Sequence, residues 1–265
     1  MDPKDIVRRG YDALSYRYRG DTEAPEQYAS WVAQLRERVP DGGAILDLGC
    51  GCGVPVAREL AASGYKMTGV DLSAVQVERA RRLVPAASFL QADAAQVRFP
   101  PSSFDAVVSL YALIHMPLDE QPSLLGRIGR WIRPGGWFLA TTGHRSWTGT
   151  EDGWLGGQAP MWWSHADAAT YRAWIERAGL AVVAQEVVPE GAGAHALFWA
   201  RRPLALPMKR VGCLTGGNAR VGEDHAAAAA TTVHRGPFRQ KGAGMAGSEQ
   251  RPTDDTHGHG AKYGG

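Results

Sequence analysis

The sequence predicts an α/β fold with a seven-stranded, mostly parallel sheet and helices on both faces. Short apolar runs alternate with helix-compatible stretches over residues 44–142, a pattern typical of parallel strands joined by right-handed crossovers. The first apolar run breaks into a turn with three alternate glycines. Polar residues stand at the ends of four predicted strands, and a doubly wound sheet gathers such residues along its ligand-binding edge. These residues are Asp47, Asp71, Asp93 and Ser109.

Two helices are expected ahead of the first strand, because aromatic and apolar side chains recur there at helical spacing. In the first helix, residues 4–18, Tyr11 and Tyr18 share one face. The second, residues 25–38, ends before a Pro-Asp-Gly-Gly turn. We therefore expect residues 1–40 to form a helical lid ahead of the main domain.

The later elements follow from apolar spacing and from end signals. Ser73 and Gln76 form a capping-box pattern, while Asp167 and Gly179 mark the two ends of the last helix. The helices expected after the first strand are residues 54–62, 73–83, 124–132 and 168–178. The strands expected after the first are residues 65–70, 87–91, 104–110, 137–142, 181–188 and 194–200.

The composition describes a protein of balanced charge from a reducing compartment. The 265 residues include 29 Lys and Arg against 27 Asp and Glu, so no nucleic-acid surface is expected. The three cysteines form neither a disulfide framework nor a zinc pattern, which predicts no bound metal. No apolar run reaches the roughly 18 residues that span a bilayer. We expect a cytoplasmic protein without membrane contact, and the sequence is compatible with a homodimer.

The glycine turn after the first strand predicts a nucleotide-like ligand. Gly49, Gly51 and Gly53 let the backbone turn sharply and approach a ligand closely, and the next helix directs free amides into the same space. Dinucleotide enzymes require a glycine where Val54 stands. A nicotinamide-dependent oxidoreductase is therefore the less favoured alternative, and Asp47 beside the turn suits a ligand that carries positive charge.

Five motifs follow one another in the order found in one enzyme family. The set resembles the class I S-adenosylmethionine-dependent methyltransferases, particularly their small-molecule branch, and the resemblance extends over residues 8–201. It implies a Rossmann-like fold for residues 41–202, with S-adenosylmethionine as cofactor. The motifs are residues 46–53, 70–73, 91–94, 104–109 with 115–117, and 132–136.

The resemblance also implies a reaction and a class of substrate. A methyl group would pass from S-adenosylmethionine to a small organic acceptor, with release of S-adenosylhomocysteine. The family and the nine tryptophans together favour an aromatic or heteroaromatic, indole-like acceptor in natural-product biosynthesis. Nitrogen, oxygen and carbon nucleophiles stay open, and a cofactor-binding protein of the same fold without catalysis is a second alternative.

The cofactor contacts implied by the resemblance lie at the strand ends and in the lid. Asp71 would accept hydrogen bonds from both ribose hydroxyls, and Asp93 would accept one from the adenine amino group. Asp47 would lie near the amino group of the methionine part. The full implied set is Tyr11, Tyr18, Asp47, Gly49, Cys50, Gly51, Gly53, Asp71, Leu72, Gln76, Asp93, Ala94, Ser109 and Leu110.

His115 and Tyr111 are the predicted catalytic residues. Methyl transfer depends mainly on alignment and on the exclusion of water, and it needs a base only if the nucleophile must lose a proton. His115 follows the fourth strand and would contact the acceptor or act as that base. In the alternative interpretation its imidazole caps the turn at residues 116–117, and Tyr111 either positions the acceptor or only packs.

Residues 143–166 interrupt the alternation of strands and helices, and we expect them to form an acceptor-binding loop. Long loops of this kind in compact domains are usually functional or disordered, and the four tryptophans present here argue against disorder. These rings would form an aromatic wall or, alternatively, a satellite core. The predicted acceptor-binding residues are Tyr11, His115, Trp154, Trp162, Trp163 and His165.

Residues 203–265 lack the apolar content of a folded core. This segment has no tryptophan, many glycines and a run of five alanines. We expect a disordered, low-complexity tail, with a small folded module as the alternative.

Overall fold

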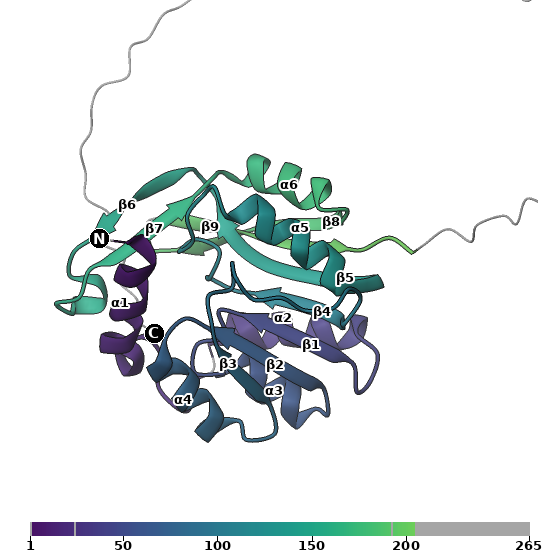
Figure 1. The fold of residues 1–265 in the computed structure, drawn as a ribbon, viewed down its shortest axis with the longest axis horizontal. Coiled ribbons are helices and arrows are strands. Elements are labelled where there is room, and N and C mark those ends of the chain that lie inside the picture. Colours follow the sequence, from purple (N-terminus) through teal and green to yellow (C-terminus); the bar gives the residue numbers. More distant parts are fainter. Residues whose placement is uncertain (1, 24, 192, 205–265) are drawn as a thin grey trace, which may run out of the picture. The chain divides into compact units, whose positions relative to one another are not determined.

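The computed structural model describes residues 2–23, 25–191 and 193–204 (Figure 1). Except for its first two residues, the segment expected to be a disordered tail, residues 203–265, lies outside the described residues.

Seven strands form one sheet in the order β3-β2-β1-β4-β5-β9-β8. The strands from β3 to β5 are parallel, and β9 runs antiparallel to both of its neighbours. The predicted seven-stranded, mostly parallel sheet is therefore confirmed. Its strands are β1 (Ala44–Leu48), β2 (Lys66–Asp71), β3 (Ser88–Gln91), β4 (Phe104–Ser109), β5 (Ile132–Gly143), β8 (Ala181–Glu190) and β9 (Gly193–Arg201).

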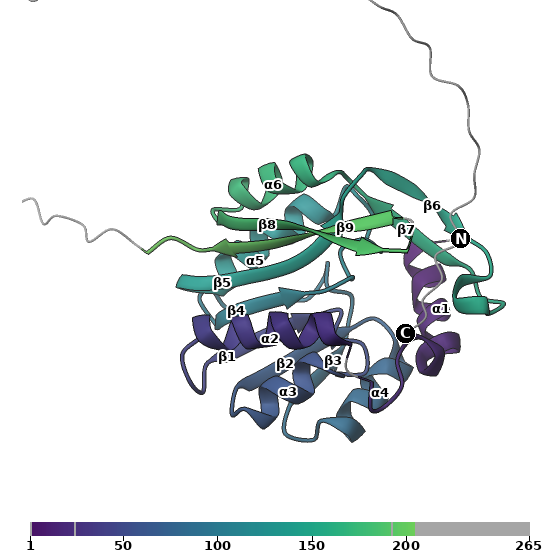
Figure 2. The same cartoon turned by 180° about the vertical axis from the view of Figure 1, so that it is seen from behind.

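Helices cover both faces of this sheet, as predicted (Figures 1 and 2). Buried side chains of α2, α3 and α4 belong to one hydrophobic core, and those of α5 and α6 belong to a second. None of the helices in the described ranges has the length and apolarity of a membrane span. The helices are α1 (Pro3–Tyr18), α2 (Glu26–Arg38), α3 (Val56–Ala62), α4 (Ala74–Leu83), α5 (Gln121–Trp131) and α6 (Ala168–Arg177).

The predicted helix ends are confirmed by their hydrogen bonds. Ser73 Oγ accepts the backbone N–H of Gln76 at 3.1 Å, and Asp167 Oδ1 accepts that of Thr170 at 2.8 Å. Gly179 follows α6 with a φ of 82°, the left-handed conformation common after helices.

The fifth strand begins at Ile132, earlier than the predicted residue 137. Residues 133–136, which lie between the predicted helix and the predicted strand, are part of this strand because they pair with the chain after β9. Gly135 donates its N–H to the Arg202 carbonyl at 2.8 Å, and Arg202 donates its N–H to the Gly136 carbonyl at 2.9 Å.

The predicted loop at residues 143–166 contains regular structure. It forms an antiparallel hairpin of β6 (Trp147–Glu151) and β7 (Met161–His165), with the short 3-10 helix η1 (Trp154–Gly156) between them. Helix α1 packs closely on β7, since a Cβ atom at Gly10 would lie 2.7 Å from Met161 Cε. The hairpin therefore supports the lid helix rather than forming an open loop.

Candidate functional site

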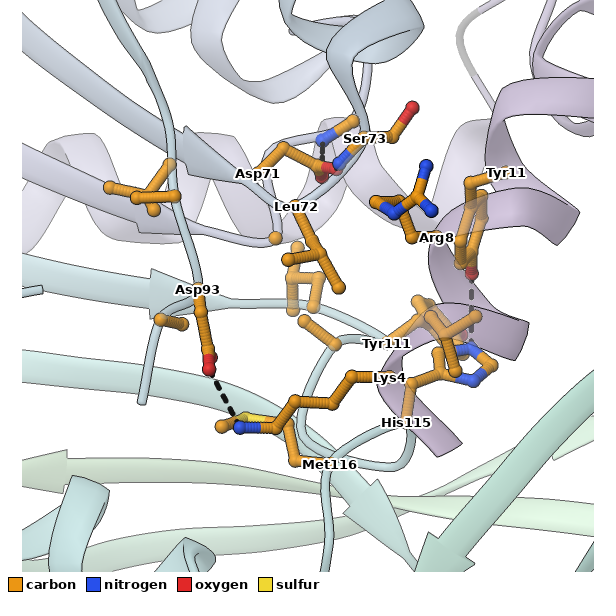
Figure 3. A pocket seen from close by; sticks show the side chains of 18 of the residues that line it. Lys4, Arg8, Tyr11, Asp71, Leu72, Ser73, Asp93, Tyr111, His115 and Met116 are labelled. Carbon is orange, nitrogen blue, oxygen red and sulfur yellow. Dashed lines mark hydrogen bonds and ion pairs between the residues drawn. The ribbon is translucent and has the colours of Figure 1, made fainter. Parts of the chain in front are cut away.

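A pocket of about 730 Å³, including its open mouth, lies at the carboxyl ends of β1, β2 and β4 under helix α1 (Figure 3). The sheet order brings these strand ends together, and α1 contributes Lys4, Val7 and Arg8 to the wall, which sequence reasoning did not identify. The predicted site residues that line this pocket are Tyr11, Tyr18, Gly49, Gly51, Asp71, Leu72, Asp93, Ala94, Leu110, Tyr111 and His115.

The glycine turn forms the floor between β1 and β2. Gly49 has a φ of 75° and donates its N–H to the Val70 carbonyl at 2.8 Å. A Cβ atom at Gly49 would lie 2.2 Å from the Cβ of Ala112, so no larger residue fits this turn. Because Gly49 has no side chain, a ligand can approach the backbone of this turn.

Asp71 is held at the end of β2 by two backbone amides. Its Oδ2 accepts from Gly51 at 2.8 Å and its Oδ1 accepts from Ser73 at 2.9 Å. Burial raises the pKa of Asp71 to about 6. Each carboxylate oxygen keeps a second lone pair, so this rigid carboxylate can accept from two ligand hydroxyls.

Asp93 is engaged by a lysine from the lid. Lys4 Nζ lies 2.6 Å from Asp93 Oδ2 (Figure 3) and also forms an ion pair with Glu120. The other oxygen, Oδ1, accepts the N–H of Ala95 at 2.8 Å. An adenine amino group at Asp93 would therefore compete with Lys4 for Oδ2.

A second, smaller pocket of about 390 Å³ adjoins the first and shares Tyr18, Gly49, Gly51 and Leu110 with it. Two further predicted residues, Asp47 and Cys50, line this second pocket. Asp47 is only 4% exposed, and burial together with the charge of Asp71 raises its pKa to about 7.

Three predicted cofactor contacts line neither pocket and are buried in packing. A Cβ at Gly53 would contact Val84 and Phe89 at 3.2 and 3.3 Å, while Ser109 Oγ donates to the Leu48 carbonyl. Gln76 Oε1 accepts from Ser15 Oγ at 2.9 Å, because α1 packs against α4 at this point. Gly53, Ser109 and Gln76 thus pack behind the walls of the two pockets.

His115 joins the lid to the hairpin through both of its ring nitrogens. Nδ1 lies 2.9 Å from the Trp162 carbonyl, which can only accept, so Nδ1 carries the hydrogen. Nε2 then accepts the hydroxyl hydrogen of Tyr11 at 3.0 Å (Figure 3). Burial lowers the pKa of His115 to about 4, and the ring is neutral at pH 7. The alternative role as a cap for residues 116–117 is not seen.

Tyr111 lines the first pocket in a constrained conformation. Its φ is 59°, unusual for an aromatic residue, and its N–H donates to Thr141 Oγ1. The hydroxyl accepts from Gln27 at 3.3 Å, and the ring packs edge-on against His195 at 5.1 Å. Burial raises the pKa of Tyr111 well above its ordinary value, so its hydroxyl fits a positioning role better than that of a base.

Two tryptophans of residues 143–166, Trp154 and Trp163, lie behind the pocket wall. Trp154 is fully buried and Trp163 is 7% exposed, as in the satellite-core alternative. Their rings pack against Tyr11 at 5.1 Å and against His115 at 4.3 Å. Trp162 and His165 do not line either pocket, and His165 Nδ1 bonds the Arg145 carbonyl at 2.7 Å.

The arrangement fits a nucleoside that carries a positively charged extension. Asp71 presents a partly buried carboxylate with accepting capacity at the first pocket, and Leu72 adds an apolar surface. Asp47 adds a second carboxylate, which is buried, in the adjoining pocket. These are the features that S-adenosylmethionine requires, with two ribose hydroxyls, an adenine ring and an ammonium group.

Known proteins support this interpretation. Residues 45–136 match the family described as a methyltransferase domain. The 27-O-demethylrifamycin SV methyltransferase of Amycolatopsis mediterranei is 38% identical over 154 residues, which are 49% of this chain and 55% of that protein. The sterol 24-C-methyltransferase ERG6A of Gibberella zeae is 36% identical over 121 residues, which are 43% of this chain and 30% of that protein. The chain thus spans about half or less of these relatives.

A solved structure shares the fold. The 1,6-didemethyltoxoflavin-N1-methyltransferase of Burkholderia thailandensis, bound to 1,6-didemethyltoxoflavin and S-adenosylhomocysteine, superposes with a TM-score of 0.59 at 18% identity. The match covers 75% of this chain and 88% of that protein. Residues 45–136 are thus similar to a methyltransferase domain, and the described part of the chain shares its fold with a solved methyltransferase.

Proposed function

We propose that this protein transfers a methyl group from S-adenosylmethionine to a small, aromatic or heteroaromatic acceptor. The observation that carries the proposal is the pair Tyr11 and His115, which stands in the same pocket as the rigid carboxylate of Asp71. A cofactor anchored at Asp71 and an acceptor beside Tyr11 would share one enclosed space. Such proximity supplies most of what an in-line displacement needs.

The shape of the pocket supports a flat, hydrophobic acceptor. Tyr11, Tyr111 and His115 lie on the side of the pocket away from Asp93 (Figure 3). Met116 lines the same pocket. Aromatic faces and a thioether favour stacking with a planar ring. The relatives named above act on rifamycin and sterol substrates by their names, so an acceptor cannot be carried over from either.

The lid and His115 suit proton removal from an oxygen or nitrogen nucleophile. When bound, S-adenosylmethionine supplies a methyl group on a positively charged sulfur. Tyr11 donates to His115 Nε2, so the Tyr11 oxygen can accept a proton from the acceptor while its own proton passes to Nε2. The low pKa of His115 keeps the ring neutral beforehand, which avoids repulsion with a cationic cofactor.

The methyltransferase, the nicotinamide-dependent oxidoreductase and the non-catalytic binding protein differ in the cofactor that they bind and in whether they form a product. Incubation with labelled S-adenosylmethionine and a library of aromatic metabolites, read by mass spectrometry, should yield a methylated product and S-adenosylhomocysteine. Asp71→Ala serves as the inactive control. Stabilisation by NAD and not by S-adenosylhomocysteine in a thermal shift would favour the oxidoreductase. Binding of S-adenosylhomocysteine without any methylated product would favour the non-catalytic alternative.

A further inference from the structure

A cluster of polar groups lies beside the first pocket, where β5, β8 and β9 end or begin. It consists of Thr142 from β5, Glu190 from β8 and His195 from β9. His195 pairs with Gly143, the last residue of β5, and β5 runs parallel to β4, so the cluster stands at the same sheet edge as the pocket. Neither Glu190 nor His195 lines either of the two pockets, so an effect on a ligand must pass through a neighbouring residue.

The imidazole of His195 is held at both of its nitrogens. Nδ1 lies 3.3 Å from the carbonyl oxygen of Thr142, which can only accept, so Nδ1 carries a hydrogen. Nε2 lies 2.7 Å from Oε2 of Glu190, a contact that becomes an ion pair when the imidazole is protonated. The side chains of His195 and Glu190 are only 13% and 23% exposed. Because water is largely excluded from this contact, it fixes the ring more firmly than an exposed pair does.

The imidazole of His195 contacts Tyr111, a residue of the first pocket with a strained backbone. The two ring centres lie 5.1 Å apart with their planes at 84°, the edge-to-face arrangement that aromatic rings favour. Tyr111 has a φ of 59°, a conformation that persists only where the surroundings impose it. Thr141 accepts its backbone N–H, and Gln27 donates to its hydroxyl. His195 adds a third support, which acts directly on the ring.

The charge of Glu190 also reaches Tyr111. Burial raises the pKa of Tyr111, and the carboxylate of Glu190 is the next largest cause of that rise. Charge effects weaken with distance, so the Glu190–His195 contact and Tyr111 belong to one polar neighbourhood. Tyr111 therefore stays protonated at pH 7, and the cluster acts on the place of its ring rather than on its ionisation.

We propose that Glu190 and His195 are positioning residues that hold the ring of Tyr111 where the methyl acceptor binds. The proposal rests on the proposed function, because it assumes that an acceptor lies against Tyr111. A chain of contacts runs from the Glu190 carboxylate through the His195 imidazole to the pocket wall. Methyl transfer depends mainly on alignment, so a small displacement of this ring lowers turnover. The β8–β9 hairpin thereby becomes part of the acceptor site without touching the acceptor.

The test measures the Tyr111 ring and the acceptor separately. In full-length protein labelled with fluorotyrosine, the fluorine NMR signal of residue 111 is identified by its loss in Tyr111→Phe. His195→Ala and Glu190→Ala should each shift or broaden that signal. With an acceptor from the aromatic library, both variants should lower kcat/KM for the acceptor about tenfold, mostly through KM. The affinity for S-adenosylhomocysteine should stay within about twofold, because the carboxylate of Asp71 is unchanged.

Two further variants make the test decisive. Glu190→Gln keeps the length of the side chain and an oxygen that accepts from His195 Nε2, so it should recover part of the loss. Glu186→Ala removes an exposed acid from the same strand and should change neither the fluorine signal nor the kinetics. An unchanged Tyr111 signal in His195→Ala, or an equal loss of acceptor and cofactor affinity, would overturn the inference. If the unmodified protein methylates no acceptor, the proposed function fails, and the fluorine signal still decides whether His195 positions Tyr111.

Discussion

The hydroxyl of Tyr11 bonds Nε2 of His115 at 3.0 Å and so ties the lid helix to the end of the fourth strand. The Trp162 carbonyl fixes the opposite nitrogen at 2.9 Å, which leaves Nε2 as the accepting atom. One imidazole therefore connects α1, the loop after β4 and the β6–β7 hairpin around a single pocket. The same atoms offer a route for a proton leaving the acceptor.

His115→Ala should lower turnover at least tenfold, because general base catalysis contributes about a hundredfold or more where it operates. The affinity for S-adenosylhomocysteine should change by less than about twofold, since the rigid carboxylate of Asp71 remains. Methyl-transfer kinetics and calorimetry measure the two effects. His165→Ala is the matched control, because that histidine lies on the β6–β7 hairpin that His115 contacts, and it lines neither pocket. Full activity in His115→Ala would leave the imidazole a purely structural link.

Asp71→Ala should raise the dissociation constant of S-adenosylhomocysteine at least tenfold. The Asp71 carboxylate is held by the amides of Gly51 and Ser73, and each ribose hydroxyl bonded to a charged group contributes about 1.5 to 3 kcal/mol. Calorimetry measures the loss, with Asp41→Ala in an exposed turn as control. An unchanged affinity would remove Asp71 from the cofactor site.

The strand ends were predictable because topology alone determines them. Parallel strands joined by crossovers bring their carboxyl ends to one edge. Of the four strand-end residues predicted from the sequence, Asp71 and Asp93 line the first pocket, Asp47 lines the adjoining one, and Ser109 lines neither. The helix caps at Ser73 and Asp167 are local hydrogen bonds within three residues, which is why these boundaries were also correct.

The rest of the site depends on contacts that no local pattern encodes. Lys4 and Asp93 are 89 positions apart, and only the packing of α1 brings them together. The β6–β7 hairpin was missed because β6 is polar and largely exposed, without the alternation that identifies a half-buried strand. Trp154 and Trp163 were predicted to lie in the pocket wall because residues 143–166 contain four tryptophans. In the structure the hairpin directs both side chains into the core behind the wall.

Lys4→Met should increase the affinity for S-adenosylhomocysteine several-fold. Lys4 occupies Asp93 Oδ2, so its removal frees the acceptor predicted for the adenine amino group and leaves the Asp93 and Glu120 charges in need of a donor. Calorimetry at two salt concentrations measures the change, and Lys66→Met, at an exposed position, is the control. A weaker affinity would instead show that Lys4 helps to hold the ligand in place.

Asp47→Asn should stabilise the ligand-free protein at pH 8. The folded-state pKa of Asp47 is raised to about 7, so the buried carboxyl favours folding while protonated. This contribution is complete below about pH 4, the ordinary range of an Asp, and is lost as the pH rises to about 7. A pKa shift of this size corresponds to a few kcal/mol of folding stability. An asparagine has no carboxyl group to ionise, so the variant does not lose this stability as the pH rises.

The comparison of the two proteins separates Asp47 from titrating groups that do not interact with it. His115 acts in the opposite direction, since its lowered pKa of about 4 makes stability rise with pH between about 4 and 6.5. It does so equally in both proteins, so urea unfolding of wild type and Asp47→Asn at pH 4 and pH 8 gives a difference due to Asp47. We expect the stability difference between the two proteins to be larger at pH 8 than at pH 4. We also expect S-adenosylhomocysteine to bind the variant more weakly. A gap that is the same at both pH values would show that the Asp47 carboxyl titrates in its ordinary range.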